Sequence, residues 1–136
     1  MDTIFKEQAQ FSVNKIDYHL LPIDSKEETI NVTISPMDSI TMVRRNLKYV
    51  ELSIRRSLRL EPVVVYVLDI EVQILIGFTD DCDTSGMSDE DIIQAFKKTC
   101  GGLLSNVMSR VSVLISTITG IGGQTPIITQ PVYIET

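Results

Sequence analysis

Residues 63–78 read VVVYVLDIEVQILIGF, and the alternation within this stretch decides the fold. Every second side chain is apolar through most of the stretch, and Asp69, Glu71 and Gln73 lie between them. The apolar positions are Tyr66, Leu68, Ile70, Val72, Ile74 and Ile76. A period of two predicts a β-strand that packs one face against a core. At 63–67 both faces are apolar, so this end is expected to be covered on both sides.

Three upstream stretches alternate in the same way and predict further strands. They are residues 10–20 (QFSVNKIDYHL), 28–35 (ETINVTIS) and 47–60 (LKYVELSIRRSLRL). In the first of these, the apolar phase of Phe11 and Val13 moves by one residue to Ile16, Tyr18 and Leu20. Such a change of phase predicts a β-bulge, which inserts one extra residue into a strand.

The connections predict an antiparallel sheet. Pro36 interrupts the second stretch, because proline cannot donate to a strand ladder, and Glu61-Pro62 is expected to form a short hairpin turn. The expected arrangement is a meander of three long strands, or four when the stretch ending near Pro36 is counted separately.

Downstream the period changes to that of a helix. Ser88 precedes Asp89, Glu90 and Asp91, a pattern that predicts a helix N-cap with carboxylates in the first turn. The apolar helical positions are Ile92, Ile93, Phe96, Cys100, Leu103, Leu104, Val107, Met108, Val111, Leu114, Ile115 and Ile118. The pair Gly101-Gly102 predicts a kink or a break, since glycine disfavours a helix interior. Gly120 is expected to end the helix.

The sequence therefore predicts an α+β fold, in which 3–4 long antiparallel strands pack against one long helix. The expected limits, in a single domain spanning 1–136, are strands over about 10–79, a helix over about 88–119 and an apolar crossover loop over 120–136. A length of 136 residues, with 43% apolar and 22% charged residues, suits one globular core.

Composition also bears on partners and location. A formal net charge of −6 disfavours duplex nucleic acid as a partner. The arginines that cluster in the sequence are interpreted as a solvated strand face with salt bridges, and they are Arg44, Arg45, Arg55, Arg56 and Arg59. Two cysteines without a CxxC motif, and an N-terminus without a signal-peptide pattern, predict the reducing cytoplasm.

The 24 residues between Arg110 and Glu135 carry no charge. Several Ser, Thr, Gly and Pro residues interrupt the stretch, so no membrane insertion is expected. One helix cannot cover both faces of a long sheet, and the excess apolar surface predicts either self-association or a sticky ligand.

Catalytic chemistry finds little support in the sequence, and no catalytic residue, cofactor or metal is predicted. His19, the single histidine, is interpreted as a partly buried structural residue in a strand. The acidic stretch 81–86 (DCDTSG) is similar to the start of a calcium loop, but Ile92 stands where that loop needs a bidentate Glu. Gly120, Gly122 and Gly123 lack the following Lys of a phosphate cradle.

Several strings resemble the SecB family of export chaperones. FSVNKIDYHL is similar to the first strand of that family, and VYVLDIEVQILIGF to its long later strand. TCGGLLSNVMSRVSVLISTITGIGGQTPIITQPVYI is similar to its main helix, the loop after that helix and the following Pro-Val segment. The resemblance covers roughly Phe11 to Tyr133. The family's second helix and tail are expected to be nearly absent, since the sequence ends at Thr136, soon after Pro131-Val132-Tyr133.

The resemblance implies a non-enzymatic, ATP-independent holdase that assembles into dimers or tetramers. It would hold unfolded polypeptides or preproteins in an apolar groove for export, with SecA as a candidate partner. The expected client-binding residues are Val111, Leu114, Ile115, Ile118, Ile121, Ile127, Ile128, Val132 and Tyr133. One alternative is a dedicated chaperone or adaptor for a single client, such as an antitoxin. A small-ligand binder that uses a cavity between sheet and helix is another.

Overall fold

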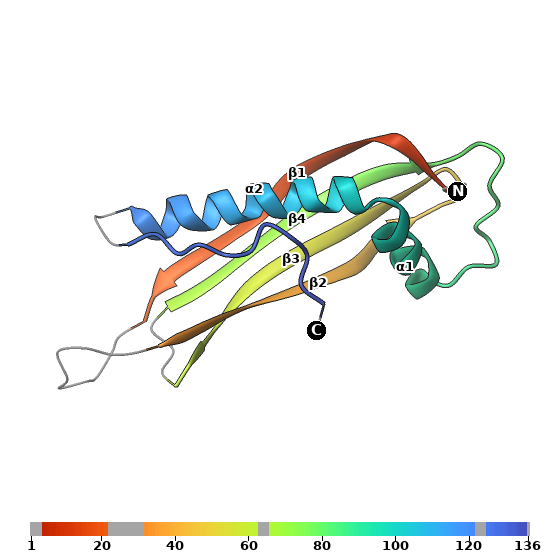
Figure 1. The fold of residues 1–136 in the computed structure, drawn as a ribbon. Helices are drawn as coiled ribbons and strands as arrows, with labels where there is room; N and C mark the ends of the chain where they lie inside the picture. Colours follow the sequence, from red (N-terminus) through yellow and green to blue (C-terminus); the bar gives the residue numbers. More distant parts are fainter. Residues whose placement is uncertain (1–3, 22–31, 63–65, 122–124, 136) are drawn as a thin grey trace, which may run out of the picture.

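The computed structural model describes residues 4–21, 32–62, 66–121 and 125–135 of the chain. Within these residues, four antiparallel strands form one sheet and two helices follow them (Figure 1). The strands are β1 (Phe5–Leu20), β2 (Thr33–Arg45), β3 (Tyr49–Glu61) and β4 (Tyr66–Phe78), and the helices are α1 (Asp89–Thr99) and α2 (Gly101–Gly120). This α+β arrangement confirms the predicted fold class. Residues 28–31 and 63–65 of the predicted strands lie outside the described residues.

The strand order is β1-β4-β3-β2. β2, β3 and β4 follow one another as the predicted meander, but β1 pairs with β4 and not with its neighbour in sequence. This pairing places the two long apolar rows of β1 and β4 side by side. β1 and β2 are therefore the two edges of the sheet.

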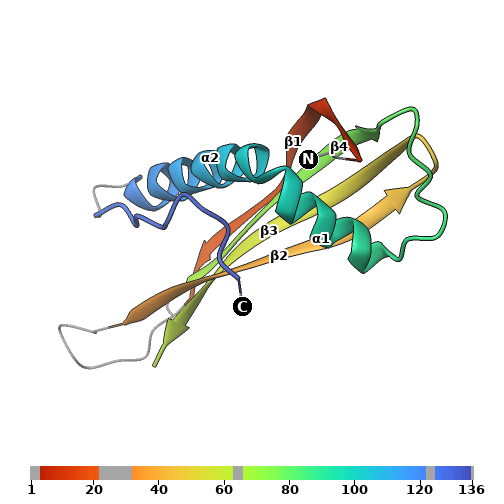
Figure 2. The same cartoon turned by 45° about the vertical axis from the view of Figure 1, so that its right-hand side comes forward.

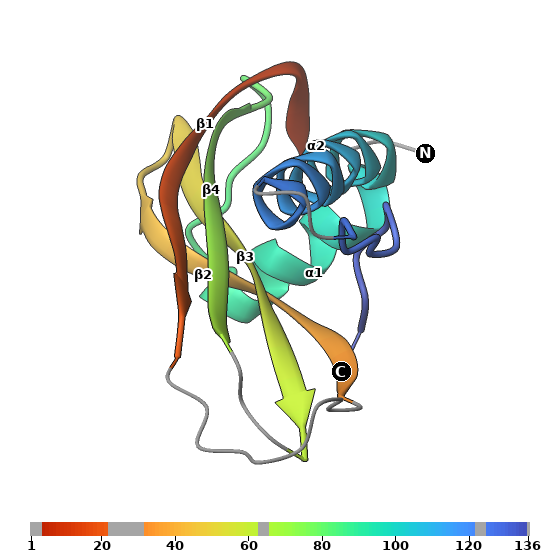
Figure 3. The same cartoon turned by 90° about the vertical axis from the view of Figure 1, so that its left-hand side faces the viewer.

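The predicted bulge in β1 is confirmed. The register between β1 and β4 shifts between Val13, which pairs with Val72, and Lys15, which pairs with Glu71. Asn14 is the extra residue, so the apolar side chains on either side of it point to the same face of the sheet. That face, called the inner face below, is the one covered by both helices (Figure 3).

β2 is longer than the sequence indicated. Pro36 does not end the strand, because β2 is an edge strand and a proline there removes no bond inside the sheet. Residues 37–45, for which no strand was predicted, continue the pairing with β3 up to Arg45. The prediction of a break at Pro36 was therefore wrong.

The helical region begins and divides as predicted. The Ser88 side chain accepts a bond from the Asp91 amide, and the Asp91 carboxylate accepts one from the Ser88 amide, which completes a capping box. The helix breaks at Cys100, directly before Gly101-Gly102, and α2 ends at Gly120. α1 lies beside β2 (Figure 2), and Arg45 of β2 donates to the Met87 carbonyl, just before α1, at 2.6 Å.

The core lies between the inner face and the helices. Phe96 of α1 meets Phe5 edge to face, with ring centroids 5.9 Å apart. The buried residues of α2 include Leu104, Val107, Met108, Val111 and Ile115. The opposite face of the sheet carries polar pairs such as Ser53 with Glu71, and neither α1 nor α2 covers it (Figure 3). Each buried aliphatic side chain stabilises the fold by about 1.5–3 kcal/mol.

Candidate functional site

The residues after α2 run back beside that helix and then cross toward β2 (Figure 1). We call residues 125–135 the C-terminal segment. Two hydroxyl groups of α2 hold it: Ser112 Oγ donates to the Thr129 carbonyl at 2.7 Å, and Thr119 Oγ1 accepts from the Ile127 amide at 2.8 Å. The side of α2 covered by this segment is the closed flank.

The far end of the closed flank is fastened by Arg56, whose side chain is fully buried in the inner face. Its Nη1 donates to Thr129 Oγ1 at 3.1 Å and to the Gln130 carbonyl at 2.6 Å. Its Nη2 donates to the Val132 carbonyl at 2.7 Å. Most of the guanidinium donors are therefore directed at the main chain of the C-terminal segment or at the hydroxyl beside it.

Asp38 balances the charge of Arg56. Its two carboxylate oxygens accept from Nε and Nη2 of Arg56, each at 2.7 Å, and its side chain is also fully buried. Asp38 Oδ2 accepts in addition from the Ile134 amide at 2.9 Å. All five guanidinium donors thus have acceptors, which a buried arginine requires.

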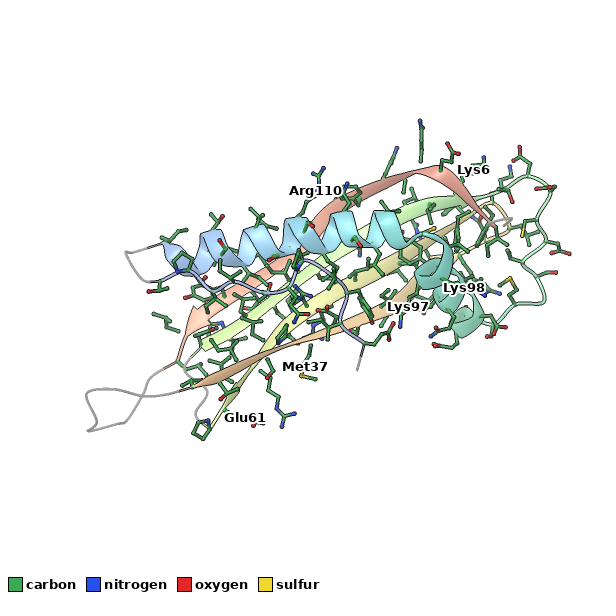
Figure 4. The ribbon with its side chains drawn as sticks, viewed as in Figure 1. Lys6, Met37, Glu61, Lys97, Lys98 and Arg110 are labelled. Atoms are coloured by element: carbon green, nitrogen blue, oxygen red, sulfur yellow. The ribbon has the colours of Figure 1, made fainter. Side chains whose placement is uncertain are left out.

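Lys97 of α1 meets the end of the C-terminal segment (Figure 4). Its Nζ lies 4.9 Å from the centroid of the Tyr133 ring and 3.2 Å from Glu135 Oε2. Partial burial lowers the pKa of Lys97, but the hydrogen bond to Glu135 and its charge, with contacts to Tyr133, outweigh this and raise the pKa. Burial raises the pKa of the Tyr133 hydroxyl above its ordinary value. Both groups are in their ordinary protonated forms at neutral pH.

The C-terminal segment directs some side chains inward and others outward, and its backbone bends at Pro131 and Val132. Ile127 and Tyr133 are partly buried and pack against the core, and Thr129 is buried between them. Ile128 and Val132 point the other way and are 78% and 46% exposed. The segment thus encloses the Thr129 hydroxyl, while two of its aliphatic side chains, Ile128 and Val132, remain exposed.

The other side of α2, the open flank, faces β1 and has no segment over it among the described residues. A groove of about 810 Å³ lies there, and its lining includes Phe11, Val13, Val107, Val111 and Leu114. Arg110 lies over the Phe11 ring at 5.1 Å, on this side of the helix (Figure 4).

Further along β1 the inner-face row continues without cover. Val13, Ile16 and Leu20 are 48%, 49% and 63% exposed, although their partners on β4 are buried.

The structure buries some of the predicted client-binding residues, wholly or in part, and leaves others exposed. Val111 and Ile115 are buried in the core, and Leu114 and Ile118 of α2 are partly buried against it. Ile121 is 72% exposed at the end of α2. The remaining predicted residues lie in the C-terminal segment, and they are Ile127, Ile128, Val132 and Tyr133. The most accessible of the nine are therefore Ile121, Ile128 and Val132.

The clustered arginines lie on two strands, β2 and β3, and they do not all point to the same face of the sheet. Arg44 pairs with Glu51, Arg55 with Asp69 and Arg59 with Glu61, in accordance with the predicted solvated face. For Arg56 that prediction was wrong, because it lies on the apolar face with Val50, Leu52, Ile54, Leu58 and Leu60. A charged residue at an apolar position of an alternating strand was the signal that could have identified it.

The structure also describes two other features that the sequence analysis singled out, His19 and the acidic loop around Asp83. His19 is exposed and lies 3.1 Å from Asp17, so its predicted partial burial was wrong. In the acidic loop, Asp83 Oδ1 accepts from the Ser85 amide, and this bond lowers the pKa of the exposed Asp83. Among the described residues, no three His, Cys, Asp or Glu side chains lie in a group that could hold a metal ion. Gly122 and Gly123 lie outside the described residues.

α2 is long and apolar enough to cross a membrane by length and composition, with a mean hydropathy of 1.2 over its best window. Core helices of soluble proteins pass the same test. In the fold, Val107, Met108, Val111 and Ile115 of α2 are buried, and Ser109 and Arg110 are exposed. α2 is therefore amphipathic, with its apolar face against the core.

Comparison with known proteins identifies the fold. No protein-family model and no curated protein matches the sequence. A protein of unknown function from Streptococcus agalactiae is similar over 93% of this chain and 98% of that one, with a TM-score of 0.47 at 12% identity. The fold is also similar to that of the SecB-like chaperone Rv1957 of Mycobacterium tuberculosis, solved in complex with a ChAD peptide from the HigA1 antitoxin. The TM-score is 0.58 at 14% identity, over 92% of this chain and 88% of that one. The α+β architecture of this chain is therefore similar to that of Rv1957.

Proposed function

We propose that this protein is a SecB-like, non-enzymatic chaperone or adaptor that binds extended or unfolded polypeptide without ATP. The observation that carries the proposal is the outward display of Ile128 and Val132 on a segment that polar contacts fasten to the sheet. Ile121 adds a third exposed aliphatic side chain at the end of α2. A single domain over 1–136 holds this surface.

Several anchors are needed for such binding. One buried aliphatic side chain contributes about 1.5–3 kcal/mol, whereas association costs about 4–15 kcal/mol. A client must therefore cover several apolar groups at once. The partly buried Leu114, Ile118, Ile127 and Tyr133 would extend the surface, and Val111 and Ile115 would support it from below.

The test is suppression of aggregation of a urea-unfolded client on dilution, in the absence of ATP. Ile128→Asp places a charge on the exposed surface and is expected to weaken suppression about tenfold, since it removes one aliphatic anchor and adds a desolvation cost. Gln130→Asp is the matched control, because Gln130 is exposed on the same segment but has no apolar group to lose. Equal activity of wild type and Ile128→Asp would contradict the proposal.

A dedicated client is the second candidate. The peptide in the Rv1957 structure comes from an antitoxin, which favours an adaptor role for a protein of this fold. The general holdase and the dedicated chaperone differ in range. The former would suppress aggregation of many unfolded chains and hand preproteins to SecA for export, whereas the latter would bind one client.

We infer further that the protein is a cytoplasmic homo-oligomer, a dimer or a tetramer. Val13, Ile16 and Leu20 leave an aliphatic row uncovered beside the unpaired edge of β1. An edge strand with such a row invites pairing with another chain. A second copy supplies the same row in antiparallel orientation through a two-fold axis. Cys82 and Cys100 are both free thiols, which suits a reducing compartment.

A further inference from the structure

Which side chains the C-terminal segment presents depends on its register against the sheet. In an extended chain, neighbouring residues point to opposite sides, so a shift by one residue exchanges the two sets. In the observed register Thr129 and Tyr133 point inward, and Ile128 and Val132 point outward. A shift would turn the outward aliphatic side chains toward the core and expose Tyr133.

Hydrophobic burial alone does not explain the observed register, although Ile127 and Tyr133 pack against the core in it. The segment carries apolar residues on both of its sides, and it buries the hydroxyl of Thr129 while Ile128 stays 78% exposed. Burial of apolar area alone would favour the opposite choice at these two positions. A directional interaction must therefore hold the register.

Ser112 and Thr119 bond to residues 127–129, and the Arg56–Asp38 pair supplies the directional contacts of residues 129–134. Arg56 reaches the carbonyls of Gln130 and Val132, two residues apart on one edge of the segment, and it also reaches the hydroxyl of Thr129. Asp38 accepts from the Ile134 amide on the same edge. A rigid planar fork matched to alternate carbonyls is satisfied in one register, and a shift would leave buried donors without acceptors.

We propose that the Arg56–Asp38 pair is the positioning element of the client-binding segment: it fixes the register and so decides that Ile128 and Val132 face the client. The inference rests on the proposed function for the client itself, but the register claim is independent of it. Arg56 and Asp38 touch no client, because both are fully buried beneath the segment.

The experiment uses the absence of tryptophan from the chain. Val132→Trp and Tyr133→Trp each introduce one tryptophan, on the outward and the inward side of the segment. Acrylamide should quench the fluorescence of the first severalfold more strongly than that of the second. The double variant Asp38→Leu/Arg56→Met replaces the pair by apolar side chains of similar size, a change that buried ion pairs often tolerate. In this background the two quenching constants should converge.

Client binding supplies the second readout, with reduced and carboxymethylated lysozyme as a permanently unfolded probe. Asp38→Leu/Arg56→Met, without the tryptophans, is expected to weaken binding about tenfold, the share of one buried aliphatic side chain. Arg55→Met/Asp69→Leu is the matched control, since it removes an ion pair between β3 and β4 on the opposite face of the sheet. It should change neither quenching nor binding.

The outcomes separate the two claims. In one outcome, the Asp38→Leu/Arg56→Met variants keep the circular dichroism spectrum of wild type, and quenching still differs between Val132→Trp and Tyr133→Trp. That result would overturn the register claim. Converged quenching with unchanged lysozyme binding would overturn the link to the client.

If wild type itself does not bind the lysozyme probe or any unfolded chain, the proposed function fails, and the quenching comparison still decides what the pair does. A variant that unfolds is replaced by Arg56→Lys, which keeps the charge but loses the fork and should give partial convergence. Unchanged quenching in Arg56→Lys would again count against the register claim.

Discussion

The two flanks of α2 show how similar apolar surface is treated in two ways. The closed flank is covered by the chain itself, and polar contacts from Ser112, Thr119 and Arg56 hold the cover in place. The open flank exposes Val13 and Ile16 of β1 beside the groove. The comparison teaches that apolar surface on one flank is covered by the chain itself, whereas on the other flank apolar side chains stay exposed among the described residues.

The largest expected effect concerns the fastening of the closed flank. Arg56→Met leaves the buried Asp38 carboxylate without its partner and should lower the free energy of unfolding by about 3–5 kcal/mol. Urea denaturation measures it. Arg55→Met, on the neighbouring residue but with a half-exposed side chain, should cost about 1 kcal/mol or less. A similar loss of unfolding free energy in both variants would contradict the claim that the buried Arg56 contributes more to stability than the half-exposed Arg55.

On the open flank, the expected effect falls on assembly. Val13→Asp/Ile16→Asp places two charges in the exposed aliphatic row and should weaken self-association by about 2–4 kcal/mol, through lost burial and added desolvation. Light scattering over a concentration series measures this. Ser12→Asp, whose residue pairs with Gln73 on the opposite face, is the control. A wild-type protein that is monomeric at every concentration would contradict the inferred oligomer.

A smaller contrast compares two serines of α2. Ser112→Ala removes the donor to the Thr129 carbonyl on the closed flank and should cost about 1–2 kcal/mol, because a buried carbonyl loses its partner. Ser109→Ala changes an exposed residue at the mouth of the groove and should be close to neutral. Thermal unfolding of the two variants under one set of conditions makes the comparison. Equal stability would show that Ser112 does not hold the segment.

The smallest effect has the opposite sign. The hydroxyl of Tyr66, at the β1 side of the sheet, is buried without a hydrogen-bond partner among the described residues. Tyr66→Phe should therefore stabilise the protein by about 1 kcal/mol, as measured by urea denaturation. Thr129 on the closed flank has a buried hydroxyl with partners in Arg56 and Ser112, and Thr129→Val should destabilise the protein in the same measurement.

The same tyrosine predicts a dependence on pH. Burial, assisted by the nearby Tyr18, raises the pKa of Tyr66 from 10.0 to about 12. The folded protein then keeps this proton at a pH where the unfolded chain has lost it, so stability should fall as pH rises through the interval between these two values. Urea midpoints measured across that range should fall less steeply for Tyr66→Phe. Parallel curves for the two proteins would contradict the assignment.

Local features were predicted well because they depend on short spacings. The bulge at Asn14, the N-cap at Ser88 and the break before Gly101 all follow from residues within one strand or one turn. β2 was predicted less well, because the effect of Pro36 depends on whether its strand is central or at an edge. Only the pairing of all four strands decides that.

The sequence indicated where the candidate site lies in the chain, but not which of its residues are exposed and which are buried. The uncharged run after Arg110 indicated an apolar surface and identified Ile121, Ile128 and Val132 among its residues. It did not show that Val111 and Ile115 are enclosed in the core, since helical periodicity identifies a face without stating what covers it.

The sequence by itself determined most of the elements of this protein: the larger part of β1, β3 and β4, where the helix starts and breaks, and that more apolar surface exists than one helix covers. Only the tertiary structure decided which part of that surface is covered. The contacts that hold the cover join residues far apart in the sequence: Arg56 is 18 residues from Asp38 and 74 residues from Gln130. A strand's alternation fixes the side on which a charge lies, but its partners come from distant segments. A buried charge is stable where the whole fold supplies those partners.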